Sequence, residues 1–371
     1  MKTQTIKHLF NLLKTALWQD KQYVKNIADV DWNCLYDLAK EQCVLALIAD
    51  SFRFLTPKQY DSKESMKWAC YVIKQERENR IMNVSVGKVF GLLKEMGLSP
   101  ILMKGQAFAA NYPFPLHRQC GDIDVYFKKH DDCYKAVAWA KTKDKTAAIS
   151  DDNKRDNQHF CFTLNRNIIE LHYHLCLFEN KTLQKRLQRI IDEEFDNNEP
   201  CFVDIEGEQT ETVPPTLSVL HQIIHISKHL LAAGIGLRQL CDLALYLDKY
   251  HSVIDKEKLN AYLNELQLVN VTESIGYILV NKLGLKADLL PFKMNKQYAD
   301  FLLNEVFKGG NFGRKNVTYR EGKNRLQRKI LSVFYFYKRC RRYKNLMPME
   351  AKSFFLNKIS LNIKLITKHH Y

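Results

Sequence analysis

The sequence lacks the patterns of a membrane-spanning, secreted or zinc-finger protein. Its ten cysteines include no C-x-x-C pair, which disfavours a structural zinc site made of four cysteines. No run reaches the length of about 18 apolar residues that spans a bilayer. Residues 1–21 interleave apolar and polar positions at helical spacing, unlike a signal peptide. We therefore expect a cytoplasmic protein with reduced thiols.

Acidic residues are scarce at one end of the chain. From Glu305 to Tyr371 there are 17 Lys and Arg against three acids, a net charge of +14 out of +15 for the whole chain. The segment NRLQRKILSVFYFYKRCRRYKNL mixes these cations with aromatic residues. Four interpretations stay open for residues 314–371: the solvated face of a packed helix, or contact with nucleic acid, a polyanionic substrate or an anionic membrane surface.

Three regions follow one another along the 371 residues, of which 46% are hydrophobic. Apolar residues at helical spacing predict helices through residues 1–96, with a stop at Gly97. Short strands and helices alternate from 97 to 210, and residues 211–371 return to helical spacing. The pattern predicts an α+β fold in which a small mixed sheet is flanked by helical regions.

The middle region predicts five short strands. Each is a short run of apolar, β-branched or aromatic residues bounded by polar or glycine-containing segments. The runs lie at 100–103, 122–127, 147–150, 159–165 and 167–175. A short helix is expected over 106–112, and a second helix over 131–141 with Asp131 as its N-cap.

Two aspartates at the start of one of these strands carry the most informative chemical signal. Asp122 and Asp124 are separated by one residue, so in an extended strand both side chains project from one face, about 7 Å apart along the chain. Carboxylates at that spacing can share divalent cations. Alone, a D-x-D pair is more often a solvated turn or a cap, so the metal hypothesis depends on the residues around it.

A lysine–glycine pair and an arginine precede the two aspartates. Lys104-Gly105 stands where a strand meets a helix, and a glycine there allows the backbone to approach a phosphate closely. Lys104 adds a cation, and Arg118 can hold a phosphate through two parallel hydrogen bonds. These residue types in this order indicate a site for a nucleoside triphosphate.

A third acid follows on a later strand. In NIIELHYHL the alternation places Glu170, His172 and His174 on one face, so an acid interrupts the expected apolar pattern. Glu170 can complete a set of three metal-binding carboxylates, although an isolated acid on an edge strand can also serve to prevent aggregation. We interpret the two histidines as packing or supporting residues and not as metal ligands.

The series LMKG, an Arg four residues before D-x-D, and a later E-x-H strand resembles the nucleotidyltransferase superfamily of DNA polymerase β type. It is most similar to the bacterial branch known as uncharacterised nucleotidyltransferases. The run HQIIHISKHLLAAGIGLRQLCDLALYL resembles the helical segment after the core, so the match covers about residues 95–250. The resemblance implies metal ligands at Asp122, Asp124 and Glu170, and a nucleotide-phosphate loop at Lys104 and Gly105.

Several positions in the matched region stay ambiguous. The broader superfamily has serine or glycine after the loop glycine, whereas this chain has Gln106, whose N–H group could still contact phosphate but whose bulk disfavours the usual geometry. Arg238 can pair with Asp242 one helical turn later or point at the nucleotide. His225 and His229 have zinc-ligand spacing, but without a clear further ligand we expect packing histidines near the nucleotide cleft.

The expected activity is therefore transfer of a nucleoside monophosphate from a nucleoside triphosphate to an acceptor hydroxyl, with two Mg²⁺ or Mn²⁺ ions. The acceptor could be a small molecule, a protein or an RNA end. The alternative is a weak or inactive nucleotide-binding module whose basic tail binds RNA or another polyanion. The three acids favour the enzyme, because clustered carboxylates repel one another unless a cation is bound.

Overall fold

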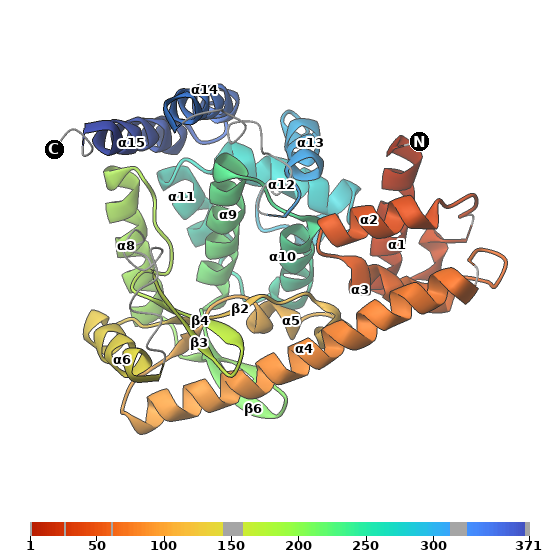
Figure 1. Ribbon diagram of the computed structural model, residues 1–371, viewed down its shortest axis with the longest axis horizontal. Coiled ribbons are helices and arrows are strands. Elements are labelled where there is room, and N and C mark those ends of the chain that lie inside the picture. Colours follow the sequence, from red (N-terminus) through yellow and green to blue (C-terminus); the bar gives the residue numbers. More distant parts are fainter. Residues whose placement is uncertain (1, 26, 61, 144–158, 312–324, 368–371) are drawn as a thin grey trace.

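The N-terminal region is helical, as predicted. The computed structural model describes residues 2–25, 27–60, 62–143, 159–311 and 325–367, and its first helices are α1 (Lys2–Trp18), α2 (Trp32–Glu41), α3 (Leu45–Ala49) and α4 (Ser62–Glu95). Helix α4 is one continuous rod that runs from these helices to the sheet (Figure 1). Gly97 ends it in a left-handed conformation, with φ of +73° and an N–H bond to the Lys94 carbonyl, which confirms the predicted stop.

A six-stranded mixed sheet forms the middle of the molecule. Its strands are β1 (Ile101–Leu102), β2 (Asp122–Tyr126), β3 (His159–Leu164), β4 (Asn167–His172), β5 (Cys201–Ile205) and β6 (Glu208–Thr212), in the order β3-β4-β2-β1-β6-β5. The β2/β4 and β1/β6 pairs are parallel, and the others are antiparallel. Four predicted strands are confirmed, the one expected at 147–150 lies outside the described residues, and the β5–β6 hairpin was not predicted.

The two faces of the sheet meet different surroundings. Residues such as Ile123, Val125 and Leu171 pack with α6 (His130–Lys143) and the second half of α4 in one hydrophobic core. The alternate residues of the same strands point to the opposite face, which carries the acids. Helix α6 begins one residue earlier than expected, so Asp131 lies in its first turn and is not its N-cap.

Helices cover the acidic side of the sheet. They are α8 (Lys181–Asp196), α9 (Pro215–Ala232), α10 (Leu237–Tyr250), α11 (Lys256–Glu265), α12 (Val269–Asn281) and α13 (Ala299–Gly309). A second hydrophobic core joins them to the N-terminal helices. Figure 1 shows α9 standing over the sheet, between α8 and α10. The α+β prediction is confirmed, although α8 was not expected.

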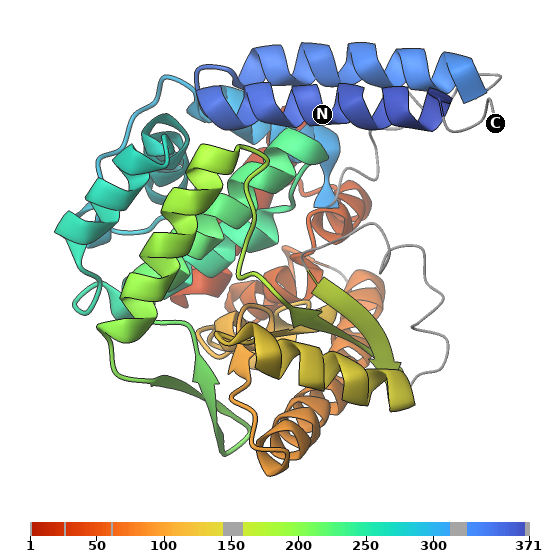
Figure 2. The same ribbon diagram turned by 90° about the vertical axis from the view of Figure 1, so that its left-hand side faces the viewer.

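The basic C-terminal segment forms a helical hairpin. Helices α14 (Arg325–Tyr343) and α15 (Pro348–Thr367) lie side by side across one end of the molecule (Figure 2). Arg339 is buried and bonds the carbonyls of Leu230 and Leu231 at the C-terminal end of α9. The hairpin is thus fixed to the rest of the fold through one of its own cations.

The domain limits at 96 and 210 remain predictions. Residue 210 falls inside β6, and α4 contributes to both hydrophobic cores through Trp68 in one half and Phe90 in the other. Among the described residues, no helix combines the length and the apolar content needed to cross a membrane.

Candidate active site

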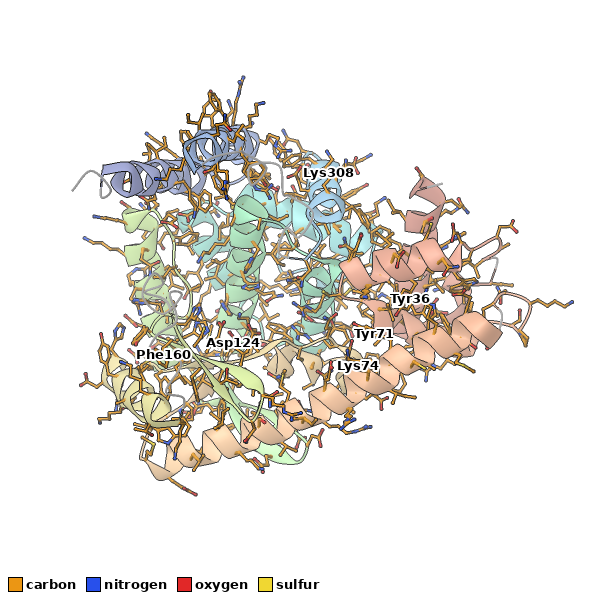
Figure 3. The ribbon with its side chains drawn as sticks, in the orientation of Figure 1. Tyr36, Tyr71, Lys74, Asp124, Phe160 and Lys308 are labelled. Atoms are coloured by element: carbon orange, nitrogen blue, oxygen red, sulfur yellow. The ribbon has the colours of Figure 1, made fainter. Side chains whose placement is uncertain are left out.

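Parallel pairing of β2 with β4 brings the predicted carboxylates together. Asp124 lies opposite Glu170 in the register, and Asp122 lies opposite Ile168. Strand β3 continues the row, because Cys161 lies opposite Glu170 on its other side. Side chains at matched positions of neighbouring strands project from the same face. One face therefore carries an acidic row below α9, where Asp124 is labelled in Figure 3.

Asp124 is fully buried, at 0% exposure, and has two partners on one oxygen. Its Oδ1 contacts Nζ of Lys104 at 2.9 Å and Nε2 of His172 at 3.0 Å. Burial acts to raise the pKa of this carboxyl, but Lys104 and the His172 hydrogen bond outweigh it and hold the pKa below its usual range. Oδ2 has no hydrogen-bond partner among the described residues. Asp124 is thus an anion with one buried oxygen still available as a ligand.

Glu170 shares His172 with Asp124. Its Oε2 lies 3.3 Å from Nε2 of His172, and its Oε1 lies 3.7 Å from Nε2 of His159. Burial opposes ionisation of Glu170, yet the His172 hydrogen bond lowers its pKa, and the two carboxylates raise the pKa of His172 against its own burial. The ligand atoms of Asp124, Glu170 and His172 lie within 4.8 Å of one another, so this group could hold a metal ion.

Asp122 differs from the other two acids. The negative charge of Asp124 and then burial raise the pKa of the Asp122 carboxyl to about 6. A like charge close to a carboxylate disfavours its ionised form, whereas a divalent cation between two carboxylates removes that penalty. The pair of strand acids is therefore under electrostatic strain that a bound cation would relieve.

The segment after β1 holds the lysine–glycine pair beside these acids. Gly105 has φ of +61°, in the region that favours glycine, and a Cβ placed there would lie 3.4 Å from the Asp122 carbonyl oxygen. Helix α5 (Gln106–Ala109), which follows, has only four residues. Gln106 is buried and lines a different cavity from the one that contains the carboxylates, so its side chain does not fill the space beside Asp122.

Arg118 is paired with a buried carboxylate of α10. Its Nε and Nη2 both donate to Asp242 at 2.8 Å, and its Nη1 donates to the Gln119 carbonyl at 3.4 Å. Asp242 also accepts from the Tyr112 hydroxyl at 2.7 Å. The guanidinium edge expected to bind phosphate is therefore engaged by a buried carboxylate. Arg118 thus joins the loop before β2 to α10. It also lines the cavity that contains the acids, and its phosphate contact stays a prediction.

Arg238 is placed differently from Arg118. Because Asp242 pairs with Arg118, the Arg238–Asp242 pair considered from the helical spacing is wrong. Nη1 of Arg238 instead donates to the Gln119 carbonyl at 2.6 Å, and Nε of Arg238 is buried without a hydrogen-bond partner among the described residues. Arg238 lines the same cavity as Lys104.

The acids open into a cavity of about 430 Å³. Its wall includes a row of histidines on α9, spaced four residues apart, together with Lys228 and, from α15, Glu350 and Phe354; the histidines are His221, His225 and His229. Burial, followed by neighbouring positive charges, lowers the pKa of each imidazole.

The expectation of histidines near the cleft is consistent with this wall. The ring centroids of His225 and His229 are 4.3 Å apart. His221 was not singled out from the sequence, although the H-x-x-x-H-x-x-x-H spacing places it on the same helix face. His174 packs edge-on against His130, as a packing residue should.

Comparison with known families agrees with this geometry. A family model described as uncharacterised nucleotidyltransferase matches residues 28–282, from before α2 to just after the end of α12. The matched range contains the whole sheet, the acids and the cavity wall on α9, and it ends before the basic hairpin. Searches of curated proteins and of solved structures gave no significant match. The chain belongs to the uncharacterised nucleotidyltransferase family.

Proposed function

We propose that the chain transfers a nucleoside monophosphate from a nucleoside triphosphate to an acceptor hydroxyl, with divalent metal ions at Asp122, Asp124 and Glu170. The observation that carries the proposal is the buried Oδ2 of Asp124, which has no hydrogen-bond partner among the described residues and belongs to a cavity-lining acid. A buried charged oxygen without a partner is costly. A metal ion bound directly to Oδ2 would give this oxygen a partner, because divalent cations of this type bind carboxylate oxygens.

The donor set fits Mg²⁺ or Mn²⁺. These ions favour carboxylate oxygens, and the carboxylates of Asp122, Asp124 and Glu170 line one cavity here. When bound, such ions would neutralise the phosphates and stabilise the charge that develops during transfer. The raised pKa of Asp122 supports this assignment, because it reflects the repulsion from Asp124 that a cation would remove.

The nucleotide phosphates are assigned to the end of the cavity beside Gly105. Lys104 and Arg238 supply positive charge there, and both line the cavity. The ammonium group of Lys104 is paired with Asp124 in the structure. A cation bound at Asp124 would release this ammonium group to contact a phosphate oxygen. Gly105 allows close approach of the backbone, and the Gln106 N–H group lies at the start of α5.

The acceptor hydroxyl is assigned to the side of Glu170 and the α9 histidines. Glu170 would accept a hydrogen bond from this hydroxyl and orient it for attack on the α-phosphorus. The new bond joins the acceptor oxygen to the α-phosphorus, and the bond from that phosphorus to pyrophosphate breaks. The proton of the hydroxyl passes to Glu170 and from there to solvent. The candidate acceptors are a small molecule, a protein and an RNA end.

Replacing the strand acids by their amides tests the metal assignment. Asp124→Asn and Asp122→Asn should each weaken Mg²⁺-dependent binding of a nucleoside triphosphate by at least about tenfold, or about 1.4 kcal/mol, measured by calorimetry. Asp131→Asn, at an exposed acid of α6, is the matched control and should bind like the wild type. Circular dichroism checks folding. Unchanged binding in folded Asp124→Asn would exclude the metal role.

A second candidate is a nucleotide-binding module that uses its basic hairpin to hold RNA. The hairpin favours it, because Phe334 and Tyr337 are 60% and 48% exposed beside the exposed cations Lys338 and Arg341. Exposed aromatic side chains among cations can stack on bases and pair with phosphates. Two parts of the segment considered from the sequence, residues 314–324 and 368–371, lie outside the described residues.

Gel-shift titrations at several salt concentrations test RNA binding. Replacing Lys338 and Arg341 by Gln should reduce the slope of log affinity against log salt by roughly 1.4, since each phosphate contact contributes about 0.7 for a single strand. Replacing Lys74 and Arg77, two exposed cations on α4, is the control and should leave the slope unchanged. A wild-type affinity that does not depend on salt would rule out this function.

A further inference from the structure

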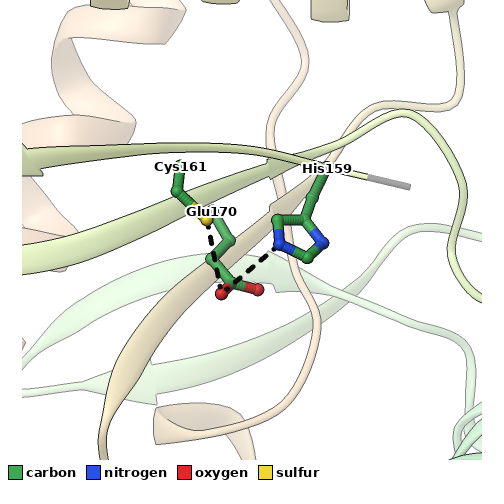
Figure 4. Close-up of side chains that lie close together, drawn as sticks. All are labelled: His159, Cys161 and Glu170. Carbon is green, nitrogen blue, oxygen red and sulfur yellow. Dashed lines mark hydrogen bonds and ion pairs between the residues drawn. The ribbon is translucent and has the colours of Figure 1, made fainter. Parts of the chain in front are cut away.

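A second group of potential metal ligands lies beside the carboxylates. Strand β3 begins at His159, and its alternate residue Cys161 faces the same side of the sheet as Glu170 on β4. Figure 4 shows the three side chains converging, with Oε1 of Glu170 between the thiol and the imidazole. None of the three is deeply buried, so ions can reach the group from solvent.

The distances match the size of a tetrahedral metal site. Sγ of Cys161 lies 3.6 Å from Oε1 of Glu170, and Nε2 of His159 lies 3.7 Å from the same oxygen. The three ligand atoms are all within 4.8 Å of one another. With bonds of about 2.0–2.3 Å to zinc, the edges of a tetrahedron are about 3.3–3.8 Å long. A metal ion could therefore bind with small side-chain shifts.

The chemistry of these donors differs from that of the aspartate pair. One imidazole nitrogen, one thiol sulfur and one carboxylate oxygen suit Zn²⁺ and similar transition metals, whereas Mg²⁺ takes oxygen ligands. We propose that His159, Cys161 and Glu170 form a binding site for Zn²⁺, which has Glu170 in common with the proposed Mg²⁺ or Mn²⁺ site at Asp122, Asp124 and Glu170. Three protein ligands leave a fourth position for water or another ligand. Binding releases the thiol proton to solvent, because the thiolate is the ligand.

The two sites share Glu170, which has a regulatory consequence. A zinc ion held through Glu170 takes that carboxylate away from the acceptor hydroxyl and from any second metal ion. Zinc should therefore inhibit transfer even when Mg²⁺ is in excess, a step that rests on the proposed function. Zinc binding itself does not rest on it, since it depends only on the three side chains.

Cobalt(II) is the probe for the site, because it occupies zinc sites and a cobalt–thiolate bond gives a charge-transfer band in the near ultraviolet. Titrating the reduced full-length protein with Co²⁺ should produce this band with one equivalent, and Zn²⁺ should abolish it. Cys161→Ser should remove the band, and His159→Gln should weaken Co²⁺ binding by at least about tenfold. Cys201→Ser, at a thiol of similar exposure on β5, should leave both unchanged.

The outcomes separate this inference from the proposed function. A band that persists in Cys161→Ser, or that is absent from the wild type, overturns the zinc site. Asp124→Asn should keep the band, because Asp124 is not one of its ligands, while losing Mg²⁺-dependent nucleotide binding. If the band is present but the nucleotide does not bind, the zinc site stands and only the transfer activity fails.

Discussion

Arg118 illustrates how a residue's role depends on its partner. An arginine before a metal-binding strand is typical of phosphate recognition, and its position along the chain supported that prediction. In the folded chain Asp242, from a helix more than a hundred residues later, takes both hydrogen bonds of the guanidinium edge. Asn79 and Gln75 of α4 hold the backbone of the same loop. These contacts fix the segment that leads into β2.

Removing Arg118 should reduce stability more than it reduces nucleotide affinity. Arg118→Met leaves the Asp242 carboxylate buried without its cation, so the free energy of unfolding should fall by about 3–5 kcal/mol in urea titrations. Arg189→Met, at an exposed ion pair, should cost no more than about 1 kcal/mol. If the two variants are equally stable and Arg118→Met binds nucleotide poorly, the phosphate role predicted from the sequence is correct.

At the scale of elements, α4 is joined to the loop before β2 by a half-buried histidine. His117 lies between two acids, with Nδ1 at 2.5 Å from Asp50 and Nε2 at 2.9 Å from Glu76. Burial opposes protonation, but these carboxylates raise the pKa of His117. Arg53 near Asp50 and Arg80 on Glu76 are the other charges in this cluster. The N-terminal helices, α4 and the loop are thus linked through one proton-binding group.

The pKa of His117 is higher in the folded state, and this direction determines how stability depends on pH. A base whose pKa is higher in the folded state contributes stability that is fully present below its unfolded pKa and is lost as the pH rises through the folded pKa. His117→Gln should therefore cost about 1.5–3 kcal/mol near pH 6, and this cost should shrink as the pH approaches about 9.

Urea titrations across this pH range measure the effect. His251→Gln, at an exposed histidine after α10, is the control and should cost little at each pH. A cost of His117→Gln that stays constant with pH would mean that the histidine is neutral in the cluster.

For the whole molecule, the basic hairpin is part of the fold and of the cavity wall. Arg339 contacts the end of α9 and also Glu305 at 3.5 Å, and α15 contributes Glu350 and Phe354 to the cavity. The hairpin nevertheless lies outside the residues that the family model matches. Part of the cavity wall is therefore formed by a segment that the family model does not match.

Arg339→Met should loosen this hairpin without unfolding the sheet. The substitution removes the hydrogen bonds to the last carbonyls of α9 and leaves Glu305 without one of its cations, a loss of about 3–5 kcal/mol for a buried pair. Hydrogen exchange measured by mass spectrometry should become faster in α14 and α15 and stay unchanged in β2 and β4. Arg341→Met, at an exposed neighbour, should exchange like the wild type. Equal protection in both variants would contradict a fixing role for Arg339.

The features that could be predicted from the sequence are those set by residues close together along the chain. Helices α9 to α13 follow from apolar spacing, and the shared face of Asp122 and Asp124 follows from the alternation of a strand. Helix α8 could have been predicted as well, because Leu183, Leu187 and Ile190 are spaced for one face and Asn180 caps the N-terminus. The β5–β6 hairpin was harder to predict, since six of its ten strand residues are acids or their amides or threonine.

Only the tertiary structure decided which distant residues meet. The parallel pairing of β2 with β4 sets Glu170 beside Asp124, β3 adds Cys161, and α10 supplies the partner of Arg118. Periodicity along a chain is set by backbone geometry and can be read locally. Strand order, register and ion-pair partners depend instead on packing summed over the whole chain, so no segment contains them by itself.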